Sequence, residues 1–407
     1  MTGSDAPSAP ADDPSPTLRR PADLRAEWTA NRSAGRRTSG PLAWPPRFAA
    51  TPADRSALLV LLGLAALTPR RLLELAVERR SATACLEAVV AGDAGSDGDR
   101  KAAAKADPTA LAERVRASRA RLIAVGDDEY PSALLDLFDP PAGLFVVGAS
   151  LADGRERVAI VGARACSPTG RDTARGMATA LSRAGVCVVS GAARGIDRAA
   201  HEGALSGSGG TIAVLGSGID HPYPRHHRAL LAEVAANGTV VSEYPPGIPA
   251  EPFRFPARNR IVAALSRAVV VVEGAAGSGS MITADHALEI GREVFAVPGS
   301  VTNPMATVPL ALIRQGATLI RDAADLLLDI GLGSPQAAAV DPGRDLDPAT
   351  RLVWDALAGP SLPDQLARAC DVPLPDVISR LVSLEMRGLV RQIGGRFERR
   401  VLDVTDR

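Results

Sequence analysis

The sequence predicts an α/β fold: a Rossmann-like, doubly wound and mostly parallel sheet, with an N-terminal helical region and a C-terminal winged-helix domain. Short β-branched runs recur between residues 155 and 330, among them Val158–Val161 and Val186–Val189. Their continuous apolar character is typical of strands buried on both faces. Helical patterns such as Thr169–Ala184 separate these runs, and strands that alternate with helices build parallel sheets.

The expected strands are bounded by glycine, serine or charged residues. Two of them, Leu122–Val125 and Leu144–Val147, lead into the central sheet. The strands of the sheet itself are expected at Val158–Gly162, Val186–Ser190, Thr211–Leu215, Thr239–Ser242, Ala268–Glu273, Val294–Val297 and Thr318–Ile320.

The regions on either side of the sheet differ in composition. Residues 1–50 are rich in Pro, Ala, Ser, Asp and Arg without a period, which predicts a disordered tail. Residues 51–120 predict a helical, helix-hairpin-helix-like region with helices at Ala57–Leu67, Arg70–Glu78 and Ala110–Ala120, and a flexible loop at 91–108. The sheet domain spans 121–333 and a linker spans 334–347.

Residues 348–407 predict three helices followed by a hairpin with Gly394-Gly395 at its turn, which is the pattern of a winged helix. The helices are expected at Pro348–Leu357, Leu362–Ala369 and Leu374–Arg387. The exposed face of the third helix carries mixed charge, whereas a helix that reads duplex DNA is usually basic. A protein-contact or regulatory role for this domain therefore stays open beside DNA binding.

Composition excludes several classes of protein. The formal net charge is zero, so a nucleic-acid site must be a local patch. The four cysteines form no CxxC pair, which favours a reduced, cytoplasmic protein without a zinc site. Neither a signal peptide nor an apolar run long enough to span a membrane is present. The turn GARACSPTG lacks the dinucleotide fingerprint, so no NAD, FAD or other cofactor is expected. The spacing of the histidines does not suit a metal site, so no metal is expected either.

Glycine and arginine follow two of the predicted strands. Gly162-Ala163-Arg164 ends the first, and Ser190-Gly191 followed by Arg194 and Gly195 ends the second. Carboxyl ends of parallel strands meet at one edge, where glycine turns and helix N-termini favour anions. We therefore expect a phosphate site there. The alternative is a structural turn in which Arg194 pairs with Asp197.

Two later segments extend this expectation. The segment FPARNR places Phe255 beside Arg258, Asn259 and Arg260, and an aromatic ring next to arginines suits single-stranded nucleic acid. Ser278, Gly279 and Ser280 open another helix, with Ser280 as the expected N-cap. A solvated helix start and simple helix capping are the structural alternatives.

With these motifs assembled, the chain resembles the DNA-processing protein A (DprA/Smf) family. The matching phrases run in family order from about residue 122 to 320: DDEYPSALLDLFDPPAGLFVVG, VAIVGARACSPTG, VVSGAARGIDRAAHEGAL, TIAVLGSGIDHPYPRHH, SEYPPG, FPARNRIVAALS, GSGSMITADHALEIGREVFAVPGS and LIRQGA.

The resemblance implies a cytoplasmic homodimer that binds single-stranded DNA and performs no catalysis. It also implies loading of a RecA-type recombinase in competition with single-strand-binding protein, during DNA uptake and natural transformation. Carried over by motif, the residues expected in the DNA groove are Gly162, Arg164, Ser190, Gly191, Arg194, Gly195, Phe255, Arg258, Asn259, Arg260, Ser278, Gly279 and Ser280.

The sequence departs from the family pattern at several points. Ala163 stands where Thr or Ser is usual, Ala192 replaces a common Leu, and TNPMATVPLALIRQGA lacks the usual Gly-x-Asn. The N-terminal region also lacks hairpin glycines, which weakens an accessory DNA role there.

Two rival functions remain. One is a phosphoribohydrolase-like enzyme of the lysine-decarboxylase-like Rossmann group, although the turn GSGSMITA lacks that group's PGGxGT pattern. The other is a transcription regulator that acts through the winged helix.

Overall fold

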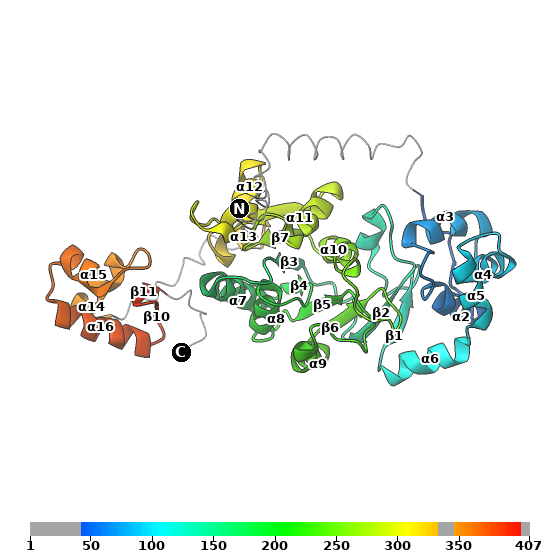
Figure 1. Cartoon of the computed structure of the whole chain (residues 1–407), viewed down its shortest axis with the longest axis horizontal. Coiled ribbons are helices and arrows are strands. Elements are labelled where there is room, and N and C mark those ends of the chain that lie inside the picture. Colours follow the sequence, from blue (N-terminus) through cyan, green and yellow to red (C-terminus); the bar gives the residue numbers. More distant parts are fainter. Residues whose placement is uncertain (1–41, 333–345, 400–407) are drawn as a thin grey trace, which may run out of the picture. The chain divides into compact units, whose positions relative to one another are not determined.

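The computed structural model describes residues 42–332 and 346–399 (Figure 1). The predicted tail at 1–41, most of the predicted linker and the chain end at 400–407 lie outside the described residues. Residues 43–50, the last part of the predicted tail, form turns that pack against the N-terminal helices. There Trp44 contacts Phe48 with their ring centroids 4.9 Å apart, and Phe48 is fully buried.

The N-terminal region consists of five described helices: α2 (Pro52–Leu61), α3 (Pro69–Arg79), α4 (Ala82–Ala91), α5 (Asp97–Lys105) and α6 (Pro108–Ala117). Helix α5 contradicts the flexible loop expected at 91–108. Its sequence carries little apolar pattern, but Ser96 and Asp99 form a capping box. The buried Asp99 carboxylate also accepts a hydrogen bond from the backbone N–H of Ala66, which ties the helix to the rest of the region.

Helix α2 begins and ends earlier than predicted. Thr51 caps it by accepting from the N–H of Asp54, and Pro52 occupies its first turn, which a proline favours because it donates no hydrogen bond. The helix ends at Leu61, two residues before Gly63.

The central sheet matches the predicted strands closely. In the described residues its strands are β1 (Arg121–Ala124), β2 (Gly143–Gly148), β3 (Arg157–Val161), β4 (Cys187–Ser190), β5 (Thr211–Leu215), β6 (Thr239–Ser242), β7 (Ala268–Val271), β8 (Glu293–Ala296) and β9 (Thr318–Leu319). Their spatial order is β1-β2-β6-β5-β4-β3-β7-β8-β9. Strands β3 to β9 are parallel, whereas β2 runs antiparallel to both β1 and β6.

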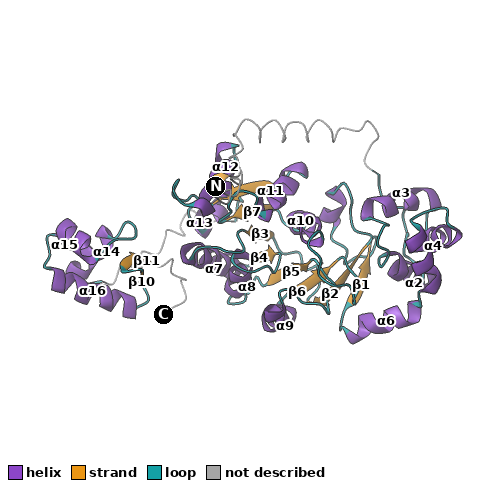
Figure 2. Cartoon of the chain, in the orientation of Figure 1, coloured by secondary structure: helices purple, strands orange, loops and turns teal. Residues whose placement is uncertain are grey.

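Helices cover both faces of this sheet (Figures 1 and 2). Helices α7 (Pro168–Arg183), α8 (Ile196–Ala204) and α9 (Arg228–Asn237) lie on one face, and α13 (Ala323–Asp329) packs beside α7. Helices α10 (Arg254–Ala264), α11 (Gly279–Glu289) and α12 (Thr307–Arg314) lie on the other. Successive residues of the strands point into opposite cores, as Val158 and Ala159 do in β3. The fold is therefore the predicted doubly wound sheet.

The C-terminal domain has the predicted winged-helix elements. They are α14 (Pro348–Ala356), α15 (Pro363–Cys370), α16 (Leu374–Met386), β10 (Val390–Ile393) and β11 (Arg396–Arg399), with Gly394-Gly395 at the hairpin turn. The domain has its own core, in which Trp354, Leu381 and Phe397 are buried. Ser361 pairs with Phe397 through two backbone hydrogen bonds, which attaches the hairpin to the helices.

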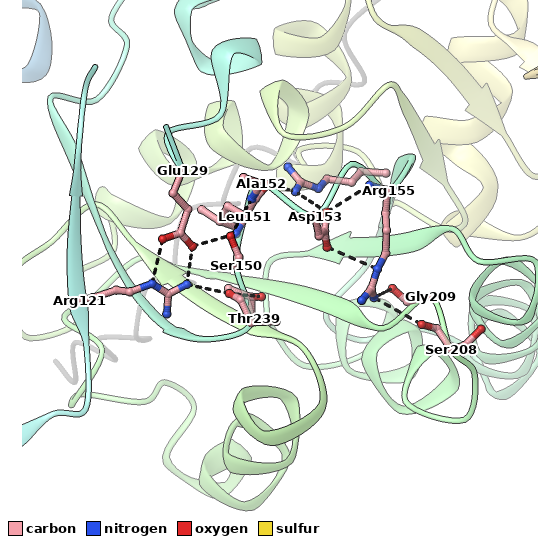
Figure 3. A network of polar contacts seen from close by, with 12 residues as sticks. Arg121, Glu129, Ser150, Leu151, Ala152, Asp153, Arg155, Ser208, Gly209 and Thr239 are labelled. Carbon is pink, nitrogen blue, oxygen red and sulfur yellow. Dashed lines mark hydrogen bonds and ion pairs between the residues drawn. The ribbon is translucent and has the colours of Figure 1, made fainter. Parts of the chain in front are cut away.

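A network of polar contacts joins the loops at the edge of the sheet where its parallel strands begin (Figure 3). Arg121 donates to both carboxylate oxygens of Glu129 and to the carbonyls of Gly148 and Ala149. Arg155 donates to the carbonyl of Gly209, just before β5, with a nitrogen–oxygen distance of 2.7 Å. We call this the amino edge. Its arginines are engaged with the backbone and with carboxylates.

Candidate nucleic-acid interface

The strand order reverses between β3 and β7, and ligands of doubly wound sheets bind beyond such a point. Here the protein itself fills the crevice. Glu273, which follows β7, accepts hydrogen bonds from the N–H of Ser167 at 2.8 Å and from its hydroxyl at 2.6 Å. Ser167 in turn caps α7. A phosphate at the N-terminus of α7 would have to displace a carboxylate, so that helix start is closed to anions.

An open pocket lies one strand further along, beyond the ends of β3 and β4. Its walls come from the turn after β3, the turn after β4, the segment before η2 (Arg225–His227) and the first two turns of α10. The lining residues are Arg164, Gly191, Ala193, Arg194, Tyr223, Pro224, Phe255 and Arg258. Five of the thirteen predicted site residues therefore line a single pocket.

Two of the lining arginines are available to a ligand. Arg164 and Arg194 are exposed, and neither forms an ion pair within residues 42–332 or 346–399. We call them the rim arginines. The guanidinium of Arg164 lies 5.2 Å from the ring centroid of Phe255, a cation–π distance that orients the side chain across the pocket. Guanidinium groups bind phosphate with two parallel hydrogen bonds, so the rim arginines suit a phosphodiester backbone.

Aromatic rings lie beside these cations. The rings of Tyr223 and Phe255 are 5.1 Å apart between centroids, and Tyr223 is about half exposed at 48%. Phe253 is 64% exposed and lies under the guanidinium of Arg254. Exposed aromatic faces next to arginines form the arrangement on which bases of a single strand stack.

Arg258 lines the same pocket, but its guanidinium forms hydrogen bonds within the protein. It is 3% exposed, and it donates to the backbone carbonyls of Gly191 and Val214. Burial lowers the pKa of Arg258 to about 10, which leaves it protonated at neutral pH. Its charge still contributes to the potential of the pocket, while its hydrogen bonds hold the turn after β4 against β5.

The turn after β4 is packed too tightly for side chains at its glycines. A Cβ on Gly191 would lie 2.6 Å from the guanidinium of Arg258. Gly195 has a φ of 78°, and a Cβ there would lie 2.2 Å from the carbonyl oxygen of Ala163. The Ser190 hydroxyl donates to the carbonyl of Ile160 at 2.7 Å and is fully buried. These residues shape the turn rather than presenting polar groups to a ligand.

Asp197 holds the same turn from the first turn of α8. Its carboxylate accepts a hydrogen bond from the N–H of Ala193 at 3.2 Å. Burial raises the pKa of Asp197, and the nearby Arg258 opposes that rise. The predicted alternative, an ion pair between Arg194 and Asp197, is absent from the contacts of the described residues, so Arg194 remains free to meet an anion.

Two buried histidines lie behind the pocket: His227 contacts the turn after β4, and His201 contacts the start of β5. His227 donates from Nδ1 to the carbonyl of Ala192 at 3.0 Å, because a carbonyl can only accept. Ala192 adopts a φ of 58°, in the left-handed region that non-glycine residues rarely occupy. His201 contacts the hydroxyl of Thr211 at 2.8 Å, and burial lowers the pKa of His201 to about 3. Burial lowers the pKa of His227 as well, so burial favours the neutral form of both rings.

Arg260, predicted to contact DNA, lies in a buried ion-pair cluster and does not line the pocket. Its guanidinium lies 3.0 Å from Asp139 and 2.7 Å from Glu243, and Arg260 itself is 5% exposed. Burial alone would lower the pKa of Arg260, but the two carboxylates outweigh it and hold that pKa above its usual value. Arg260 therefore joins α10 to β6 and to the segment before β2.

The remaining predicted residues lie beside the pocket rather than in it. Asn259 donates to the carbonyl of Gly279 at 3.1 Å, which links α10 to the start of α11. The N-cap of α11 is Ser278, not Ser280 as predicted, and Ser280 is buried. A Cβ on Gly162 would lie 2.6 Å from Ile196, so this glycine permits close packing of α8 on β3.

Sequence reasoning missed Tyr223, Pro224 and Ala193 as pocket residues. The phrase PYPRHH carries a signal for Tyr223, since it places an aromatic ring next to Arg225, as FPARNR does for Phe255. In the described residues no group of three or more His, Cys, Asp or Glu side chains could hold a metal ion. No helix in residues 42–332 or 346–399 is long and apolar enough to cross a membrane.

Comparison with known proteins decides the family. The family model described as "DNA recombination-mediator protein A" matches residues 121–331, just over half of the chain. The chain belongs to this family. A second model, the DprA winged helix domain, matches residues 336–396, so the recombination-mediator family accounts for both the sheet domain and the winged helix.

Relatives within the recombination-mediator family support this assignment. Protein Smf of Escherichia coli is 38% identical over 287 residues, which cover 68% of this chain and 77% of that protein. The DNA processing protein DprA of Streptococcus pneumoniae is 42% identical over 203 residues, covering 50% of this chain and 72% of that protein. The X-ray structure of DprA from that species superimposes with a TM-score of 0.60 at 33% identity, covering 69% of this chain and 98% of that structure.

Proposed function

We propose that this chain binds single-stranded DNA at the pocket beyond β3 and β4, and that it acts there as a recombination mediator. The observation that carries the proposal is the placement of the two exposed rim arginines beside the ring pair of Tyr223 and Phe255. Cations that meet phosphates and rings that stack on bases together recognise a strand whose bases are unpaired.

The start of α8 adds a second attraction for phosphate. Its N-cap is Gly195, which has no side-chain oxygen to accept from the N–H groups of the first turn. The N-termini of α7 and α11, by contrast, are capped by Ser167 and Ser278. Helix starts favour anions through these N–H groups and the helix dipole. The N–H of Ile196 already donates to the carbonyl of Ala163, so the attraction comes from the helix dipole, whose partial charge adds to that of Arg164, Arg194 and the buried Arg258.

In the proposed role, the chain loads a RecA-type recombinase onto incoming strands during DNA uptake and competes with single-strand-binding protein. Membership of the recombination-mediator family supports this role. We further propose a homodimer in the cytoplasm, and we expect no catalysis. The strand would be held through its backbone and released when the recombinase covers it.

Fluorescence anisotropy with a labelled oligothymidine tests the DNA site. We expect Arg164→Ala combined with Arg194→Ala to weaken binding about a hundredfold, because a hydrogen bond to a charged group contributes about 1.5–3 kcal/mol. Arg183→Ala is the matched control, since Arg183 is an exposed arginine at the far end of α7. Wild-type affinity in the double variant would place the DNA site elsewhere.

A second experiment tests loading. We expect the chain to speed assembly of a RecA-type filament on a strand already covered by single-strand-binding protein, and the double rim variant to lose this effect. If the chain binds DNA but does not accelerate filament assembly, the mediator role fails while the DNA site stands. If it binds no DNA, release of a base from a nucleoside monophosphate becomes the assay that distinguishes the rival enzyme.

A further inference from the structure

The winged-helix domain exposes a row of apolar side chains along α16. Val377, Leu381 and Leu384 of this helix are buried in the domain core. Leu374, Ile378 and Val382 are nevertheless 41–44% exposed, and Met386 is 85% exposed. These four residues are spaced by four, so they form one continuous ridge that crosses the outer surface of the helix. We call them the α16 ridge.

Duplex DNA does not suit this surface. In a winged helix that reads the major groove, the third helix usually presents cations. Here the Arg380 side chain is held within the domain, because its guanidinium contacts Asp347 and the hydroxyl of Thr350. Arg387 is exposed at the end of the helix, whereas Asp376 and Glu385 are exposed along it. An apolar ridge flanked by mixed charge is instead typical of a protein contact.

The row of side chains beside the ridge contains small residues at its centre. It consists of Pro375, Ser379, Ser383 and Arg387, again spaced by four. The two serines are small and exposed, so the row that contains them is lower than the ridge beside it, as the groove between ridges of a helix surface is. A surface that carries a ridge and a matching groove is self-complementary, because the ridge of one copy fits the groove of another related by a two-fold axis.

Charge fixes the direction of such a pairing. Asp376 lies in the first turn of α16 and Arg387 directly after its last residue. In an antiparallel pair, the Arg387 end of one helix approaches the Asp376 end of the other, and the two helix dipoles oppose each other. A parallel pair would bring like charges together at both ends. The antiparallel arrangement also sets Ile378 of one copy opposite Val382 of the other.

We propose that the α16 ridge is a self-association surface through which a second copy of this chain docks, with its α16 antiparallel. One helix face provides much less area than the ~800 Å² per partner of a standard interface, so the contact is weak by itself. It becomes effective when other contacts hold two copies near each other, because tethering raises the effective concentration. This inference does not rest on the proposed DNA site.

Sedimentation velocity of the full chain over a wide concentration range tests the surface. We expect Val382→Glu to weaken concentration-dependent association about tenfold or more, because a carboxylate would be buried without a partner. Ala369→Glu, at an exposed position of α15 in the same domain, is the matched control and leaves association unchanged. Equal association of wild type and Val382→Glu would overturn the proposal, whatever the DNA-binding result.

Disulfide formation tests the direction. Ile378→Cys and Val382→Cys proteins are prepared in a Cys370→Ser background, since Cys370 is partly accessible on the same domain. Cysteines bridge only when their Cα atoms lie within about 7 Å. We expect a mixture of the two proteins to form the mixed disulfide faster than either protein forms a disulfide with itself. Faster self-pairing of Ile378→Cys, or pairing no faster than Ala369→Cys, would overturn the antiparallel contact.

Discussion

The two edges of the central sheet use arginine in opposite ways. At the amino edge, Arg121 and Arg155 are held by carboxylates and backbone carbonyls (Figure 3). At the carboxyl edge, Arg164 and Arg194 are exposed and have no ion-pair partner in the described part of the chain. An arginine whose donors are already bonded stabilises the fold, whereas one whose donors face solvent can bind an anion. Exposed arginines without ion-pair partners are found at the carboxyl edge, in Arg164 and Arg194, whereas Arg121 and Arg155 of the amino edge are bonded.

Within the FPARNR segment two buried arginines are held by different partners. Arg258 and Arg260 are both buried, yet Arg258 lines the pocket and Arg260 lies in a carboxylate cluster. Substitutions in the carboxylate cluster, in the pocket and at the amino edge test this division.

Replacing Arg260 should cause the largest loss of stability. We expect Arg260→Met to lower the free energy of unfolding by about 3–5 kcal/mol, because it leaves the buried Glu243 without its cation. Denaturant unfolding measures this loss. Glu243→Gln added to Arg260→Met should restore part of it, since no buried carboxylate is then left unpaired. A loss below about 1 kcal/mol would show that the cluster behaves like a surface pair.

Acid should destabilise the fold through His201, which contacts Thr211 at the start of β5. The unfolded chain protonates His201 near the ordinary pKa of 6.5, whereas burial holds the folded pKa at about 3. The stabilising contribution is therefore complete above the unfolded pKa and is lost as the pH falls toward 3, by about 1.4 kcal/mol per pH unit. Unfolding curves of wild type and His201→Asn across this range provide the measurement. Equal pH slopes for the two proteins would contradict the neutral, buried ring.

Removing the exposed ring should weaken DNA binding without affecting the fold. We expect Tyr223→Ala to reduce affinity for oligothymidine by about 1–3 kcal/mol, the contribution of stacking one base. Tyr223→Phe keeps the ring and should bind like wild type. Equal loss in both variants would mean that the hydroxyl, and not the aromatic face, contacts the strand.

An arginine of the amino edge should have the smallest effect. Arg155→Ala should lower stability by about 1 kcal/mol or less, because its contacts are partly exposed, and oligothymidine affinity should not change. If Arg155→Ala weakened DNA binding as strongly as Arg164→Ala, the distinction between the two edges would fail.

The sequence predicts the sheet well because its strands are continuous apolar runs separated by helical patterns. Strands β5 and β6 lie at the predicted residues, and the winged-helix elements agree within two residues at most ends. Helix α5 was missed because Asp97–Lys105 is polar and depends on the Ser96–Asp99 capping box. The pattern of apolar residues alone does not reveal a helix that depends on its cap.

The site was predicted less completely, for a different reason. A motif rich in arginine does not reveal which guanidinium is buried, because burial depends on partners distant in sequence. Asp139 lies 121 residues from Arg260, and Gly191 lies 67 residues from Arg258. Tyr223 enters the pocket only because the segment after β5 folds back over the turn after β4, which no local pattern encodes.

The salt dependence of oligothymidine binding tests the central claim most directly. Each phosphate neutralised on a single strand contributes about −0.7 to the slope of log affinity against log salt concentration. If the rim arginines each neutralise one phosphate, Arg164→Ala with Arg194→Ala should flatten the wild-type slope by about 1.4, while Arg183→Ala leaves it unchanged. An unchanged slope in the double variant would show that the rim arginines contact no phosphate.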